Sequence, residues 1–161
     1  MIITTQGRYA LRLMLDLAEH QGEGYISLTE ISKRQNFSKK YLEQIIMSMH
    51  HEGMLNAVRG HYGGYRLARE PKDYTLWEIL SVTEKHLDTV ACLTGGKTDC
   101  PTQNRCATVL VWKSLYDVIR NHLSAITLQD VLNDKLRLEE LAAGPIKEGE
   151  PRPEGLLNGC P

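Results

Sequence analysis

The 161-residue chain has no apolar run that approaches the roughly 20 residues needed to cross a bilayer. Its N-terminus, MIITTQGRYALRL, has neither an apolar central region nor a small-residue cleavage site. We therefore expect a cytoplasmic protein without a signal peptide or a membrane partner. Cysteine is scarce, with four residues, and clustered cytoplasmic cysteines bind metals or take part in redox chemistry more often than they form disulfides.

Catalytic signatures are also missing. Gly96-Lys97-Thr98 resembles the end of a phosphate-binding loop, but Ala91 stands where the first glycine should be. His51-Glu52 opens like a zinc-protease motif, but Leu55 occupies the second histidine position. Because no other nucleophile–base pattern is present, we expect that the protein is not an enzyme.

An overall excess of positive charge is absent as well, since the formal net charge is −1. The charge is unevenly spread, however, and residues 33–69 carry seven basic side chains against only Glu43 and Glu52. Local charge decides phosphate contacts within a screening length, so this segment can bind nucleic acid. The seven basic residues are Lys33, Arg34, Lys39, Lys40, Arg59, Arg66 and Arg69.

Helical spacing of apolar residues dominates the first 53 positions. A first helix begins after Thr4 or Thr5 and runs to about His20. Ser27 and Glu30 form a capping box that opens a helix to about Arg34, and Ser38 caps a third helix that ends near Glu52. Two short helices joined by the turn 35–37 predict a helix-turn-helix.

The stretch MLNAVRGHYGGYRLA fits two short strands joined by a glycine-rich turn. A hairpin directly after a helix-turn-helix is typical of a wing. Thr75 and Glu78 form a second predicted capping box, which opens a helix to about Glu84.

A longer helix is predicted from Ala107 to Leu123, and a last helix from Thr127 to about Leu141. The apolar face of the longer helix is wide enough to pack against its own domain and against a second copy. That face comprises Val111, Trp112, Leu115, Val118, Ile119 and Leu123.

The predicted fold class is therefore mainly α, a winged helix-turn-helix domain with a two-strand wing and a long C-terminal dimerisation helix. We expect the winged domain over residues 1–84 and a cysteine loop over 85–106. The dimerisation helix and the last helix occupy 107–141, and the Pro- and Gly-rich tail, 142–161, is expected to be disordered.

The third helix is the predicted DNA reader, because base edges are met by the first turns of such a helix. Lysines there suit phosphates or guanine, a glutamate can accept a hydrogen bond from cytosine, and the wing tip can reach a minor groove or phosphates. An ordinary solvated helix face and a plain hairpin are the alternatives. The candidate residues for binding double-stranded DNA are Ser38, Lys39, Lys40, Tyr41, Glu43, Arg59 and His61.

Cys92, Cys100 and Cys106 are separated by seven and five residues, unlike the CxxC pairs of structural zinc sites. Wider spacings suit an iron–sulfur cluster, which can take thiolates from around a loop. A zinc site and three unrelated thiols are the alternatives. Cys160 lies in the tail and is not expected to take part.

Three stretches carry a family resemblance: TTQGRYALRLMLDLA, SLTEISKRQNFSKKYLEQI and GMLNAVRGHYGGYRLA. With them, the chain resembles the Rrf-type winged-helix transcriptional regulators, and most closely those of the IscR type. The resemblance implies a homodimer that binds a palindrome-like operator. It also implies that the regulator senses iron–sulfur, redox or nitric-oxide status. It also implies that Cys92, Cys100 and Cys106 hold the cluster, and that Ser38, Lys40, Tyr41, Glu43 and Arg59 face DNA.

The chain departs from relatives of this type at two positions. Val109 stands where IscR-type members place a histidine, and Arg8 where the nitric-oxide sensor has an aspartate. The fourth ligand is open among His86, Asp88, Asp99, Asn104 and a group of a partner subunit, as is the choice between a 2Fe–2S and a 4Fe–4S cluster. Other open hypotheses are a cluster-free regulator of cysteine metabolism controlled by a partner protein, a zinc-stabilised regulator and an electron carrier.

Overall fold

The computed structural model describes residues 3–60, 62–84, 87, 88, 90, 92–94, 97, 98, 100 and 105–134. Within them the chain is mainly helical with a two-strand wing, which confirms the predicted fold class. The predicted tail, the end of the last helix and His61 lie outside the described residues. No described helix is long and apolar enough to cross a membrane.

The first three helices begin at the caps that the sequence predicts. Helix α1 spans Thr5–Glu19 and is capped by Thr4, whose side chain accepts a hydrogen bond from the Gly7 N–H. Helix α2 spans Leu28–Gln35 and has the complete capping box. Helix α3 spans Lys39–His51, and the side chain of Ser38 caps it. Each cap satisfies an N–H group that has no partner within the helix.

The turn between α2 and α3 is set by one residue in a left-handed conformation. Asn36 has φ 55° and ends α2, and the chain then enters α3 through Phe37 and Ser38. Asparagine tolerates this region better than most residues. The helix-turn-helix follows directly from this local geometry.

The wing consists of strands β1 (Leu55–Val58) and β2 (Gly64–Leu67), paired antiparallel with Leu55 opposite Leu67. Gly60 has φ 117° in the connecting turn. A Cβ atom at Gly64 would lie 2.3 Å from the Ile26 carbonyl oxygen, so glycine permits this close approach. Two hydrogen bonds between Ile26 and Tyr65 fasten β2 to the chain before α2.

A short 3-10 turn, Pro71–Asp73, leads into helix α4, which spans Leu76–Thr83. The Thr75 side chain caps α4 by accepting from the Glu78 N–H, as predicted. The Glu78 carboxylate forms an ion pair with Arg69, which comes from the segment after the wing. In a complete capping box the Glu78 side chain would bond the Thr75 N–H, but here it pairs with Arg69 instead.

One continuous core joins these elements. Burial of such side chains contributes about 1.5–3 kcal/mol each, before the conformational entropy of folding is subtracted. Among the most buried members are Leu13, Met14, Leu17, Ile31, Leu42, Ile45, Ile46, Met49, Met54, Tyr74 and Ile79.

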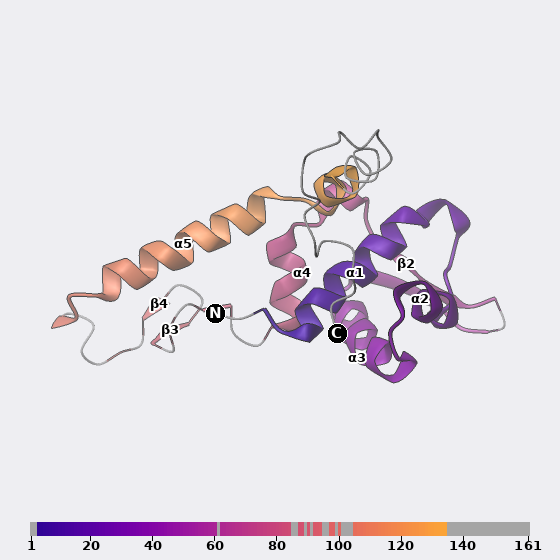
Figure 1. Ribbon diagram of the computed structural model, residues 1–161, viewed down its shortest axis with the longest axis horizontal. Helices are drawn as coiled ribbons and strands as arrows, with labels where there is room; N and C mark the ends of the chain where they lie inside the picture. Colours follow the sequence, from indigo (N-terminus) through magenta and orange to yellow (C-terminus); the bar gives the residue numbers. More distant parts are fainter. Residues whose placement is uncertain are drawn as a thin grey trace, which may run out of the picture.

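Helix α5, Val109–Ala125, begins and ends two residues later than predicted, and it projects away from the winged domain (Figure 1). Strands β3 (Leu93–Thr94) and β4 (Lys97–Thr98) form a small hairpin in the cysteine loop that the sequence did not predict. Residues 128–134 are helical, after a reciprocal pair of hydrogen bonds between Thr127 and Asp130. The side chain of Leu128 is buried in the core of the winged domain.

Candidate nucleic-acid interface and cysteine loop

The first turns of α3 present polar side chains to solvent. Ser38 holds the start of the helix, because its Oγ accepts a hydrogen bond from the Tyr41 N–H at 3.3 Å. Lys39, Lys40 and Glu43 are exposed. Cations and a carboxylate on one accessible helix start can meet phosphates and base edges.

Tyr41 is half-buried because it rests on an aromatic stack that the sequence analysis missed. Its ring meets the edge of Tyr9 at 5.4 Å, and Tyr9 lies flat on Phe37 with ring centroids 3.8 Å apart. The Arg12 guanidinium covers Phe37 at 4.4 Å. Burial raises the pKa of Tyr41, with Tyr9 and Glu84 adding to the effect. The Tyr41 hydroxyl therefore keeps its proton at neutral pH and can donate a hydrogen bond.

A buried ion pair fixes the helix-turn-helix to α1. Asp16 is buried in α1 and accepts from Arg34 Nε at 3.0 Å and from Arg34 Nη2 at 2.8 Å. The Gln35 side-chain amide donates to the same carboxylate at 2.9 Å. The end of α2, and with it the turn into α3, is thus held against α1.

Ion pairs neutralise part of the basic charge that was counted for residues 33–69 in the sequence. Arg34 is paired with Asp16, and Arg69 is paired with Glu78. The simple count of seven basic residues therefore overstates the charge available to DNA. Sequence order alone could not reveal the change, because Asp16 and Glu78 both lie outside the counted segment.

The wing brings a further cation near its tip. Arg59 is exposed directly after β1, and Tyr62 is 90% exposed. His61, the other predicted wing contact, is not among the described residues. Arg66 is occupied by a cation–π contact with Tyr25 at 4.7 Å, which leaves Arg59 as the cation best placed at the tip.

None of the three loop cysteines is in a disulfide; Cys92 is exposed, and Cys100 and Cys106 are half-buried. The Cys106 sulfur lies 3.4 Å from the Thr108 hydroxyl, and hydrogen bonds to Thr108 lower the pKa of the thiol. Three cysteines outside disulfides, one of them with a lowered thiol pKa, fit the donor set of an iron–sulfur cluster.

Among the described residues, the structure does not bring the three thiols together, either with one another or with a fourth ligand. In the part of the chain that is described, no three His, Cys, Asp or Glu side chains form a group able to hold a metal. Of the fourth-ligand candidates, only Asp88 is described, and it is half-buried. His86, Asp99 and Asn104 lie outside the described residues. Val109 is the first residue of α5 and has no donor atom in its side chain.

The start of the cysteine loop is anchored to α1. Glu84, which follows α4, is buried, and its Oε1 accepts from the Thr4 N–H at 2.9 Å and from the Thr4 hydroxyl at 3.0 Å. A Cβ atom at Gly7 would lie 2.1 Å from the same Oε1. Glycine at position 7 therefore permits the carboxylate to reach the start of α1.

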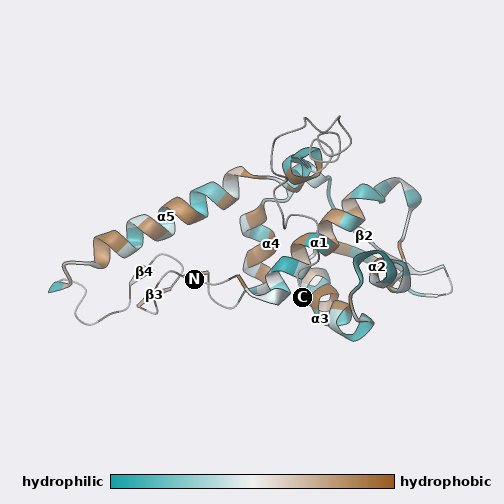
Figure 2. Cartoon of the chain, in the orientation of Figure 1, coloured by the Kyte–Doolittle hydropathy of each residue, from teal (hydrophilic) through white to brown (hydrophobic). Residues whose placement is uncertain are grey.

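Helix α5 has one face packed on its own domain and another exposed. Tyr116 is buried and meets Trp77 of α4 edge-on, with ring centroids 5.7 Å apart. Apolar residues recur along α5 (brown in Figure 2), and several of their side chains are exposed. The exposed apolar residues are Leu110, Val111, Trp112, Leu115 and Val118.

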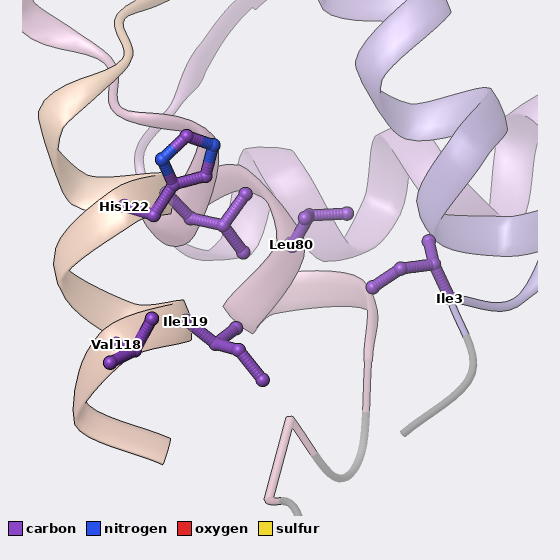
Figure 3. Close-up of a pocket in the computed structure, with 6 residues that line it drawn as sticks. Ile3, Leu80, Val118, Ile119 and His122 are labelled. Carbon is purple, nitrogen blue, oxygen red and sulfur yellow. The ribbon is translucent and has the colours of Figure 1, made fainter. Parts of the chain in front are cut away.

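An apolar hollow of about 240 Å³ lies where α5 meets α4 and the N-terminal segment (Figure 3). The exposed wall of this hollow is apolar, with the His122 ring among its lining residues. The hollow is lined by Ile3, Leu80, Val118, Ile119, His122 and Leu123.

Comparisons with known proteins agree with this architecture. The family model Rrf2, described as an iron-dependent transcriptional regulator, matches residues 3–134. A Photorhabdus laumondii protein named HTH-type transcriptional regulator IscR is 36% identical over 135 residues, which cover 84% of this chain and 81% of that protein. The solved structure of T. potens IscR has a TM-score of 0.69 at 37% identity and covers 86% of this chain and 91% of its own. That of CymR, the global cysteine regulator of B. subtilis, has a TM-score of 0.67 at 34% identity and covers 83% and 97%.

Proposed function

The chain belongs to the Rrf2 family of DNA-binding transcriptional regulators, and on this premise we propose that it is a homodimer whose operator binding responds to an iron–sulfur cluster. The regulator is not an enzyme, since its relatives are named transcriptional regulators. The observation that carries the proposal is a set of three cysteines outside disulfides, Cys92, Cys100 and Cys106, in the loop between the winged domain and α5.

On double-stranded DNA, α3 lies in the major groove with Ser38, Lys39, Lys40, Tyr41 and Glu43 toward the duplex. The two lysines contact phosphates or guanine, and Glu43 selects cytosine by accepting a hydrogen bond from its amino group. Glu43 also repels phosphate when the helix is misplaced, so it favours selectivity over affinity. Arg59 and His61 of the wing contact the minor groove or the phosphates beside it.

The second copy packs on the exposed apolar face of α5. Val111, Leu115 and Val118 recur at helical spacing, which gives one stripe along the helix. A paired α5 holds two reading helices about one DNA turn apart, roughly 34 Å, and thereby matches a palindrome-like operator.

An iron–sulfur cluster would supply a thiolate-bound iron centre whose stability depends on oxidants, nitric oxide and iron supply. Cys92, Cys100 and Cys106 would hold it, and a fourth ligand would come from Asp88, from the loop residues His86, Asp99 and Asn104, or from the partner subunit. Hydrogen bonds to Thr108 lower the pKa of the Cys106 thiol, which favours the thiolate form that would bind iron.

The protein's own part in the response lies in how the loop is attached. One end is fixed by Glu84 to the start of α1, and the other runs into α5. Changes in the order of the loop therefore act on the angle between the winged domain and α5. Operator occupancy would change only to the extent that the cluster-bound and cluster-free proteins favour different angles between the winged domain and α5.

The experiment is anaerobic purification with iron, sulfide and zinc analysis and an electron spin resonance spectrum. We expect iron and sulfide in equal amounts, with visible absorption that is lost in Cys92→Ala, Cys100→Ala and Cys106→Ala. Cys160→Ala is the matched control and should keep the colour. Wild-type protein that contains zinc and no iron, while still binding its operator, would refute the cluster and favour the zinc-stabilised regulator.

A cluster-free regulator of cysteine metabolism, controlled by a partner protein, is the second candidate. It is favoured by the likeness to the solved global cysteine regulator CymR. The same purification separates the two, because this candidate would be colourless and still bind DNA after treatment with a chelator.

A further inference from the structure

Tyr74 joins the two roots of the wing through its hydroxyl group. The side chain is fully buried, and the hydroxyl donates to the Met54 carbonyl oxygen at 2.7 Å. The Tyr74 hydroxyl oxygen also accepts hydrogen bonds from the N–H groups of Ala68 at 3.0 Å and Arg69 at 2.8 Å. Met54 directly precedes β1, and Ala68 and Arg69 directly follow β2. The hydroxyl therefore fixes both points at which the wing leaves the domain.

The backbone around Tyr74 is bound to the segment that leaves α5. The Tyr74 carbonyl oxygen accepts from the Leu128 N–H at 2.9 Å, and the Leu76 N–H donates to the Ile126 carbonyl oxygen at 3.0 Å. These two bonds form a small antiparallel bridge between Thr75 and Thr127. Leu128 is itself buried in the core, so the root of α5 cannot move without pulling on this bridge.

A second attachment of the wing is the pair of hydrogen bonds between Ile26 and Tyr65 at 2.9 and 2.8 Å. That attachment lies on the side of α2 and has no bond to the segment after α5. The two attachments therefore join the wing to different parts of the molecule. Ile26 connects it to the helix-turn-helix, and Tyr74 connects it to the segment that follows α5.

We propose that Tyr74 is the positioning residue that sets the wing, and with it Arg59, according to the orientation of α5. The inference rests on the proposed function, in which the cysteine loop changes that orientation. When α5 tilts, residues 126–128 shift the backbone of Tyr74, and its hydroxyl carries the shift to Met54, Ala68 and Arg69. Arg59, at the far end of β1, then gains or loses its place on the DNA.

A double-mutant cycle tests this link without any change in the cluster. The full-length protein and its Tyr74→Phe, Arg59→Ala and double variants are titrated by fluorescence anisotropy against a duplex that the wild-type protein selects from a random library. We expect Arg59→Ala to weaken binding about tenfold in the wild-type background and only about twofold in Tyr74→Phe, because groups in one network are not additive. Equal losses in both backgrounds would show that Tyr74 has only a general structural role.

Tyr25→Phe is the matched control. The Tyr25 ring stacks on Arg66 of β2 through its face, and a phenylalanine keeps that contact. We expect Arg59→Ala to cost the same in this variant as in the wild-type protein. Coupling as strong as in Tyr74→Phe would overturn the specific part assigned to the Tyr74 hydroxyl.

Amide hydrogen exchange of the unmutated protein covers the case in which Tyr74→Phe does not fold. The exchange rates of the Ala68 and Arg69 amides should change when a chelator removes the iron, whereas the Ile26 amide should change less. Unchanged rates at Ala68 and Arg69, together with a change in DNA affinity, would overturn the proposal. DNA affinity that does not respond to chelation refutes the sensing function instead, and the double-mutant cycle still decides whether Tyr74 sets the wing.

Discussion

Replacing Arg34 with methionine should destabilise the fold strongly, although Arg34 lies at the surface end of its ion pair. The variant keeps the apolar stem and removes the guanidinium that donates to Asp16 at 3.0 and 2.8 Å. The Asp16 side chain is 1% exposed and would retain only the Gln35 amide at 2.9 Å. A buried carboxylate would thus lose most of its hydrogen bonds.

The magnitude follows from the two lost bonds. Hydrogen bonds to a charged group contribute about 1.5–3 kcal/mol each, so the upper range is about 3–6 kcal/mol. Because the Arg34 side chain is 31% exposed, water can replace part of the lost hydrogen bonding. The expected loss in the free energy of unfolding is therefore about 2–4 kcal/mol. For a domain of this size, that lowers Tm by roughly 6–12 °C.

Urea unfolding followed by circular dichroism measures the loss. Lys33→Met is the matched control, because Lys33 is exposed on the same helix and should change stability by less than about 0.5 kcal/mol. Adding Asp16→Asn to Arg34→Met should restore part of the stability, since no charge is then left buried. An Arg34→Met variant within about 1 kcal/mol of the wild type would show that Asp16 does not depend on this partner.

Four further predictions concern α3, the wing, α5 and the cap of α2. Glu43→Ala should loosen sequence choice more than affinity, and an unchanged ranking across an operator library would count against its role in reading cytosine. Arg59→Ala should lower the slope of log affinity against log salt by about one, and an unaltered slope would mean that the wing does not touch phosphate. Val118→Asp should yield monomers in analytical ultracentrifugation while the exposed Asn121→Asp does not, and an unshifted dimer would place the interface elsewhere. Hydrogen bonds from the Ser27 side chain and backbone lower the pKa of Glu30 below 4.5, so this capping box stabilises α2 above that pH and is lost as the pH falls through the lowered value. Ser27→Ala should raise the pKa of Glu30 in an NMR titration, and an unmoved midpoint would contradict the cap.

Local signals made most of the winged domain predictable. Ser27 with Glu30, and Ser38 before α3, act within three residues of sequence, so the caps could be read directly. Strands β3 and β4 have two residues each, which is too short for an alternating pattern to show. The start of α5 was predicted at the first apolar residue, Ala107. In the structure the helix follows the turn 106–108 and begins at Val109.

Contacts between distant residues could not be predicted in this way. Glu84 meets Thr4 across 80 positions, and the Tyr74 hydroxyl binds backbone groups that any residue type would offer. The paired state of Arg34 and Arg69 likewise depends on acids outside the basic segment. The cysteines were identified from spacing alone, and the fourth ligand has no such pattern.

The contact between Gly7 and Glu84 leaves room for no more than a hydrogen atom. A single methyl group there would evict the carboxylate from the first turn of α1 without touching a cysteine or a DNA contact. Gly7→Ala would therefore detach Glu84, at the start of the cysteine loop, from α1 while all the cysteines stay in place.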